Sequence, residues 1–190
     1  MEIELMFEET DEKLENSRWT KTVPIIARGS TVTAYLMNEV YEPDTYNELC
    51  YTLEHTAADY VELVMNNTGG MMDSMVMIRE SIAKSNATVV AVLSGTVASA
   101  ATMVALACDE VEVAQYTSWL THYYSGGSAG KGNEIKAKHD FDEVEIPKMF
   151  KEIHTGFLTD EEIDRVIDGK DIWLNKDEIE TRFARMKGSK

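Results

Sequence analysis

The sequence has little of several features that would assign it to a specialised class of protein. It has two cysteines, Cys50 and Cys108, and no Cys-x-x-Cys pair or His/Cys cluster, so we expect reduced packing residues and no metal site. No apolar run approaches the roughly 18 residues of a membrane span. The acidic N-terminus lacks the basic and then apolar segments of a signal peptide. These absences predict a soluble, cytoplasmic protein, and no motif indicates a cofactor.

Positive charge is also scarce. Lysine and arginine together number 18 against 34 aspartates and glutamates, which gives a formal net charge of -16. Nucleic-acid binding needs a basic surface, and an anionic membrane surface attracts basic segments. The composition therefore excludes nucleic acid and membrane as expected partners.

The remaining composition is that of a globular protein. The chain has 190 residues, of which 44% are hydrophobic, enough to bury the core of one domain. Residues 1–22 are charged and weakly patterned, so we expect an arm that contacts other subunits or a disordered tail, with one short strand at 3–7. Residues 23–190 are expected to form the domain.

Apolar runs and glycine-containing turns alternate along this domain. We expect strands near residue 25 and over 31–37, 60–65, 88–93, 111–113 and 118–121, and helices over 43–56, 71–84 and 98–107. Such alternation is typical of an α/β fold with parallel strands and right-handed crossovers. The carboxyl ends of parallel strands form the site in these sheets.

Three features follow predicted strand ends. Gly69-Gly70 comes after strand 60–65, Ser99 stands at the start of helix 98–107, and His122 ends strand 118–121. A serine at a strand-to-helix turn can act as a nucleophile, and a nearby histidine can serve as its general base. The alternatives are that Ser99 only caps the helix, that the glycines form an ordinary turn, and that His122 is a surface or core residue.

These features lie within longer motifs. They are NNTGG at 66–70, GTVASAAT at 95–102, WLTH at 119–122, the glycine-rich YYSGGSAGKGNEI at 123–135, and HTGFLTDEEID at 154–164. Over roughly residues 30 to 176 the chain resembles the Clp protease proteolytic subunit, ClpP, and its crotonase-like relatives. The resemblance implies a ClpP/crotonase-like fold of repeated βαβ units with a long protruding helix over residues 132–154, which Pro147 should break or kink.

The resemblance also implies a set of functional residues. Ser99 would be the nucleophile, His122 the general base, and the backbone N–H groups of Gly70 and Ala100 the oxyanion hole. Asn67-Thr68 replaces the family's Ser-Pro, which backbone donors should tolerate. The expected third member of the triad is Asp168, with Asp164 and Asp171 nearby, although Asp168-Gly169 also reads as a turn.

The implied assembly is a ring-shaped homo-oligomer, a heptamer or double heptamer, that encloses a serine endopeptidase acting on polypeptides. No Gly-x-x-x-x-Gly-Lys-Ser/Thr loop is present, so unfolding would need an AAA+ ATPase partner. The compact segment between Ser99 and His122 and the short, charged helix expected at the C-terminus look more like the ClpP-like proteases of tailed phages. That subfamily would act in the host cytoplasm, for instance in phage head maturation.

Two rival functions remain open. The first is a catalytically inactive ring subunit with an assembly or regulatory role, which the uncertain aspartate would favour. The second is an acyl-CoA-handling crotonase, but those enzymes carry acid/base carboxylates that we do not find beside Gly70 or Ala100.

Overall fold

The computed structural model describes residues 23–188, so the expected arm over 1–22 and its strand at 3–7 lie outside the described residues. Seven strands form one sheet in the order β1-β2-β3-β4-β6-β7, with β5 paired to β4. The strands are β1 (Ile25–Arg28), β2 (Thr31–Val40), β3 (Tyr60–Gly70), β4 (Thr88–Ala98), β5 (Glu110–Val113), β6 (Ser118–Thr121) and β7 (Ile172–Leu174).

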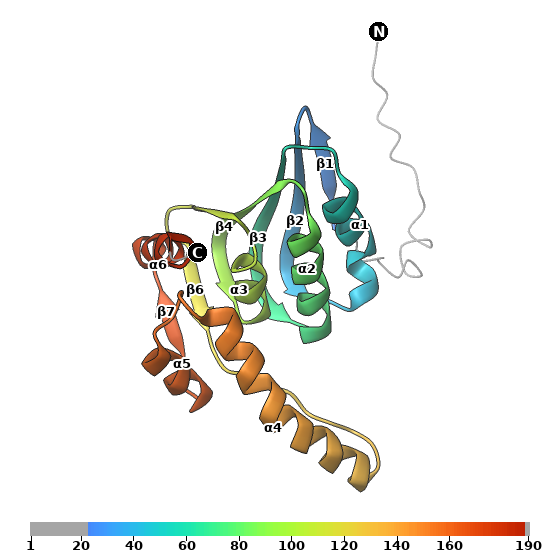
Figure 1. The fold of residues 1–190 in the computed structure, drawn as a ribbon, viewed down its shortest axis with the longest axis vertical. Helices are drawn as coiled ribbons and strands as arrows, with labels where there is room; N and C mark the ends of the chain where they lie inside the picture. Colours follow the sequence, from blue (N-terminus) through green and yellow to red (C-terminus); the bar gives the residue numbers. More distant parts are fainter. Residues whose placement is uncertain (1–22, 189–190) are drawn as a thin grey trace, which may run out of the picture.

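The helices alternate with these strands. They are η2 (Pro43–Tyr46), α1 (Asn47–His55), α2 (Met72–Lys84), α3 (Ala100–Ala105), α4 (Gly132–His154), α5 (Asp160–Ile167) and α6 (Lys176–Gly188). The pairs β2–β3, β3–β4, β4–β5 and β4–β6 are parallel, as the alternation predicts. Helices α1, α2 and α3 lie together over one face of the sheet (Figure 1).

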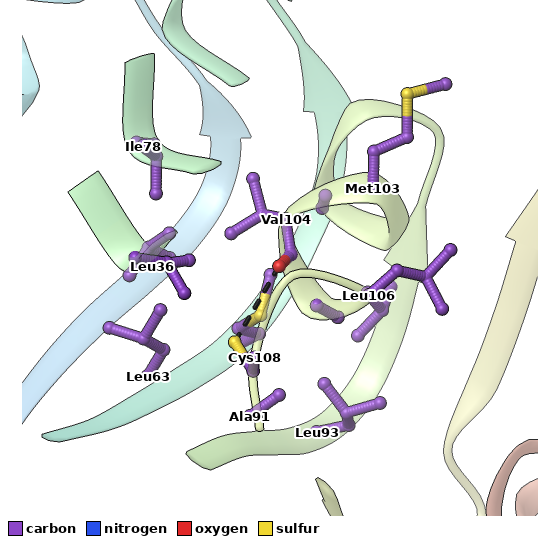
Figure 2. Packing of buried hydrophobic residues seen from close by; sticks show 14 of the residues in the cluster. Leu36, Leu63, Ile78, Ala91, Leu93, Met103, Val104, Leu106 and Cys108 are labelled. Carbon is purple, nitrogen blue, oxygen red and sulfur yellow. Dashed lines mark hydrogen bonds between the residues drawn. The ribbon is translucent and has the colours of Figure 1, made fainter. Parts of the chain in front are cut away.

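The core lies between that face and these helices. Alternate residues of β3 are buried, and α3 is buried along its whole length. Figure 2 shows Leu36 and Leu63 from the sheet beside Ile78 of α2 and Val104 of α3. Cys108 is buried here, and its thiol donates a weak hydrogen bond to the Val104 carbonyl oxygen at 3.7 Å. Burial raises the pKa of Cys108 to about 12, so the thiol is an inert packing group.

Strands β2, β3 and β4 are longer in the structure than predicted. Strand β4 does not end at Ser94-Gly95 but continues to Ala98, because its last residues pair with β6 after a register shift. Gly95 has a φ of 73°, which glycine adopts without steric cost. Strand β3 likewise continues through Gly70, so the expected glycine turn, with positive φ at Gly69 and Gly70, forms the last residues of this strand. The expected helix over 98–107 is accordingly limited to α3.

Helix α4 projects away from the sheet, and the segment between β6 and α4 runs back along it (Figure 1). Its observed bounds agree with the predicted helix over 132–154. The helix continues through Pro147, so the expectation of a break there is wrong. Only Phe150 and His154, both near its C-terminal end, are buried.

The C-terminal elements are tied to the domain. Arg182 of α6 forms a bidentate ion pair with Glu162 of α5, with both N···O distances 2.8 Å. The hydrogen bonds from Arg182 lower the pKa of Glu162 to about 2. Helix α6 agrees with the predicted C-terminal helix and buries Ile179, Phe183 and Met186. Within residues 23–188, no helix is both long and apolar enough to cross a membrane.

Candidate active site

Ser99 occupies a strained position between β4 and α3. Its φ of 54° and ψ of -127° are rare for a residue with a side chain and cost on the order of 1–3 kcal/mol. The Ser99 N–H donates to the Leu120 carbonyl oxygen at 2.9 Å, and the Ser99 carbonyl oxygen accepts from the Thr102 hydroxyl at 2.6 Å. The Ser99 hydroxyl makes no capping hydrogen bond. The side chain is therefore not a helix cap, and the strained backbone serves some other purpose.

The glycine turn at the end of β3 packs directly against this serine. A Cβ atom on Gly69 would lie 2.6 Å from the Ser99 Cβ and 2.9 Å from the Ala100 nitrogen. A Cβ on Gly70 would instead collide with the Val40 carbonyl oxygen. Both glycines have positive φ, at 92° and 147°. Only residues without side chains fit here, and the absence of a side chain on Gly69 lets the end of β3 lie directly against Ser99.

His122 follows the end of β6, two residues beyond the Leu120 that holds Ser99. Its Nδ1 lies 2.5 Å from the Tyr123 carbonyl oxygen, so Nδ1 is the donor in that hydrogen bond, and in the corresponding neutral tautomer Nε2 is an acceptor. No hydrogen bond between Ser99 and His122 occurs within the described chain. Tyr123 packs edge-on against Phe150 of α4, with ring centroids 5.9 Å apart, which ties the segment after His122 to the base of α4.

Asp164, Asp168 and Asp171 are the candidates for the carboxylate that orients His122. Strands β6 and β7 are antiparallel, and Thr121 pairs with Ile172. Continuing this register by one residue sets His122 opposite Asp171. Asp168 lies three residues earlier, at the C-terminal end of α5, where its N–H donates to the Asp164 carbonyl oxygen at 2.9 Å. All three carboxylates belong to exposed residues, and none is hydrogen-bonded to His122 in the part of the chain described.

Sequence reasoning did not identify Asn67. Its Oδ1 accepts a hydrogen bond from the Gly69 N–H at 2.9 Å, in a buried setting. The signal was present in the sequence, because an Asn two residues before a Gly is a common Asx-turn pattern. The family comparison, in contrast, marks Asn67-Thr68 only as a departure from Ser-Pro.

A metal site is not supported near these residues. The one His/Asp/Glu group of suitable geometry within residues 23–188 is His139, Asp140 and Glu143, with ligand atoms within 4.8 Å of one another. All three are exposed on α4, and Asp140 already pairs with Lys136 at 2.7 Å. Such surface groups commonly form ion pairs without a metal.

The site thus combines a parallel α/β sheet, a strained serine at a strand-to-helix turn, a glycine turn beside it and a histidine at the next strand end. Residues 17–180 match the protein-family description "Clp protease", so the chain belongs to the Clp protease family. Among solved structures it is similar to a mutant of ClpP1 from Listeria monocytogenes, with a TM-score of 0.60 and 22% sequence identity, over 79% of this chain and 86% of that one. The α/β, ClpP-like fold is therefore confirmed. No curated protein matched the sequence.

Proposed function

We propose that this protein is a serine endopeptidase in which Ser99 is the nucleophile and His122 the general base. The observation that carries the proposal is the strained Ser99 backbone. It leaves the Ser99 hydroxyl without a helix-capping bond, next to β6, the strand that His122 follows. Such strain persists where function requires it. The His122 tautomer also suits the role, because a free Nε2 lone pair can accept the serine proton.

The reaction follows from these positions. His122 Nε2 takes the Ser99 proton while Oγ attacks the carbonyl carbon of a peptide bond, and the oxygen of that carbonyl becomes an oxyanion. His122 then gives the proton to the leaving amine, and water hydrolyses the acyl-enzyme. We assign the Gly70 and Ala100 N–H groups to the oxyanion. Met71 N–H donates to the Val40 carbonyl oxygen at 2.8 Å, so at this point it is Met71, and not Gly70, that donates to β2.

A fluorophosphonate probe tests this assignment, because it reacts with activated serines. Labelling of the wild type that disappears in Ser99→Ala and persists in Ser94→Ala supports it, since Ser94 is an exposed serine of the same strand. Loss of Ser99 or His122 should each lower peptidase activity by about 10⁴-fold. Failure of the wild type to react with the probe or to cleave peptides would favour the alternative, an inactive ring subunit.

The orienting carboxylate is proposed from the pairing of β6 with β7. The β6–β7 register supports Asp171, whereas the sequence favours Asp168. Whichever aspartate orients His122, its carboxylate would have to replace the Tyr123 carbonyl oxygen as the hydrogen-bond acceptor of His122 Nδ1. The single substitutions Asp164→Asn, Asp168→Asn and Asp171→Asn separate the candidates, and we expect Asp171→Asn to lose the most activity. Full activity in all three would indicate a serine–histidine dyad oriented by that carbonyl.

We also propose that the chain assembles into rings, as a heptamer or double heptamer enclosing the sites. Helix α4 supports this, because Phe141 and Val144 on its outer part are 62% and 64% exposed. The charge of -16 opposes close packing, so assembly should strengthen with salt. Light scattering across a salt series tests this, and a monomer at every salt concentration with activity retained would contradict it. The same proposal includes a polypeptide substrate, an AAA+ ATPase as partner, a tailed-phage origin and a cytoplasmic location.

A further inference from the structure

Asn67 has an unusual environment for a polar side chain. It is 1% exposed, and it lies on the face of β3 that also buries Leu63 and Met65. Its Oδ1 accepts the Gly69 N–H at 2.9 Å. Its Nδ2 is buried with no hydrogen-bond partner among the described residues. A buried donor without a partner destabilises a fold by about 1–3 kcal/mol, so a polar residue here requires an explanation.

The explanation lies in the turn that Asn67 holds. Two successive glycines have many backbone conformations available, so their own sequence does not fix a single geometry. Yet Gly69 must fit against Ser99, where a Cβ atom would lie only 2.6 Å away. The buried side-chain hydrogen bond within this turn is the one from Gly69 to Asn67. Thr68 bonds to the Asn38 carbonyl oxygen on the exposed side of the turn.

We propose that Asn67 is a positioning residue for the oxyanion-binding turn. Its Oδ1 engages the Gly69 N–H, which keeps that donor from the substrate and holds the next donor, the Gly70 N–H, in place beside Ser99. The inference rests on the proposed peptidase function. Asn67 does not touch the reacting atoms, so its contribution is made through the turn and should appear mainly in kcat. The unpartnered Nδ2 is a consequence of using an amide side chain as the acceptor.

The decisive comparison is between Asn67→Ser and Asn67→Ala. The two variants leave nearly the same cavity, but only serine supplies an oxygen that can accept from the N–H two residues on. Removing one oxyanion donor costs about 10²–10³ in kcat, so displacing it through the turn should cost about 10- to 100-fold in Asn67→Ala. Asn67→Ser should recover most of that loss, with little change in KM for either. Thr68→Val, on the exposed side of the turn, is the control and should retain activity.

A second measurement does not depend on catalysis. Hydrogen exchange of the Gly69 amide should be slow in the wild type, fast in Asn67→Ala and intermediate in Asn67→Ser, and the same order should hold with Ser99→Ala added. Equal kcat in the serine and alanine variants, or a Gly69 amide unaffected by either, would overturn the inference. Failure of the wild type to react with fluorophosphonate would instead overturn the peptidase proposal and leave the exchange result to decide the role of Asn67 in the turn.

Discussion

The end of the sheet around Ser99 and the outer part of α4 are stabilised in opposite ways. Around Ser99, every residue of α3 is buried and glycines allow backbones to touch. On α4, 23 residues contribute two buried side chains, and exposed i,i+4 ion pairs line the surface, such as Lys136–Asp140. Surface pairs of this kind contribute about 0.3–0.5 kcal/mol each. The first region is packed within the chain, whereas the second exposes apolar side chains, Phe141 and Val144, to solvent.

Adding one methyl group in each region should give the largest contrast. In Gly69→Ala the new Cβ would meet Ser99 and the Ala98 carbonyl oxygen at 2.6 and 2.7 Å, on a backbone with a φ of 92°. We expect a loss of about 2 kcal/mol or more in unfolding free energy and of about 100-fold or more in peptidase activity. Gly132→Ala at the start of α4 is the control, because nothing lies within 4 Å of its Cβ position. Chemical denaturation and peptide hydrolysis measure both, and equal behaviour of the two variants would refute the contrast.

Removing one aromatic ring from the exposed part and one from the buried part of α4 should separate folding from assembly. Phe150 is 1% exposed, packs against Tyr123 and stacks on His154 at 4.0 Å, so Phe150→Ala should cost about 3–5 kcal/mol of unfolding free energy. Phe141 is 62% exposed. Phe141→Ala should leave the stability of a protomer within about 0.5 kcal/mol but weaken the oligomer. Thermal unfolding and light scattering distinguish these effects, and unchanged oligomer size in Phe141→Ala would argue against that face as the interface.

Acid should lower the free energy of unfolding by a smaller amount, through His154 at the buried C-terminal end of α4. Burial lowers the pKa of His154 to about 4, an effect that nearby Arg79 adds to and the hydrogen bond to the Phe150 carbonyl oxygen opposes. The unfolded chain, with an ordinary histidine pKa near 6.5, therefore binds the proton first as the pH falls. Stability should be full above about pH 6.5 and decrease by on the order of 2–3 kcal/mol down to about pH 4. Denaturant midpoints across this range, compared with those of His154→Gln, measure the effect. An equal decrease of the denaturant midpoint with falling pH in His154→Gln would assign the loss of stability to other groups.

Local sequence patterns predicted most of the elements. Periodicity identified α2 and most of β2, because apolar spacing reports which face an element buries, whereas the bounds of α4 came from the family resemblance. It failed at Ser94-Gly95, where a locally reasonable strand end is overridden by pairing with β6. It failed again at Pro147, within a helix that continues through it. In both places the surroundings in the folded structure, and not the adjacent residues in the sequence, decide the outcome. No window of a few residues contains that information.

The sequence by itself determined the α/β fold, the family and the positions of Ser99, His122 and the glycine turn, because each follows a strand whose apolar pattern is local. Only the tertiary structure decided the register of β6 on β7, which favours Asp171 over Asp168 as the partner of His122, and the burial of Asn67 against its own turn. Those two strands lie about fifty residues apart in the chain, and a shift of one residue changes the partner. The Asn67 contact depends on a side chain folding back onto its own turn. Such contacts are fixed by packing, not by spacing.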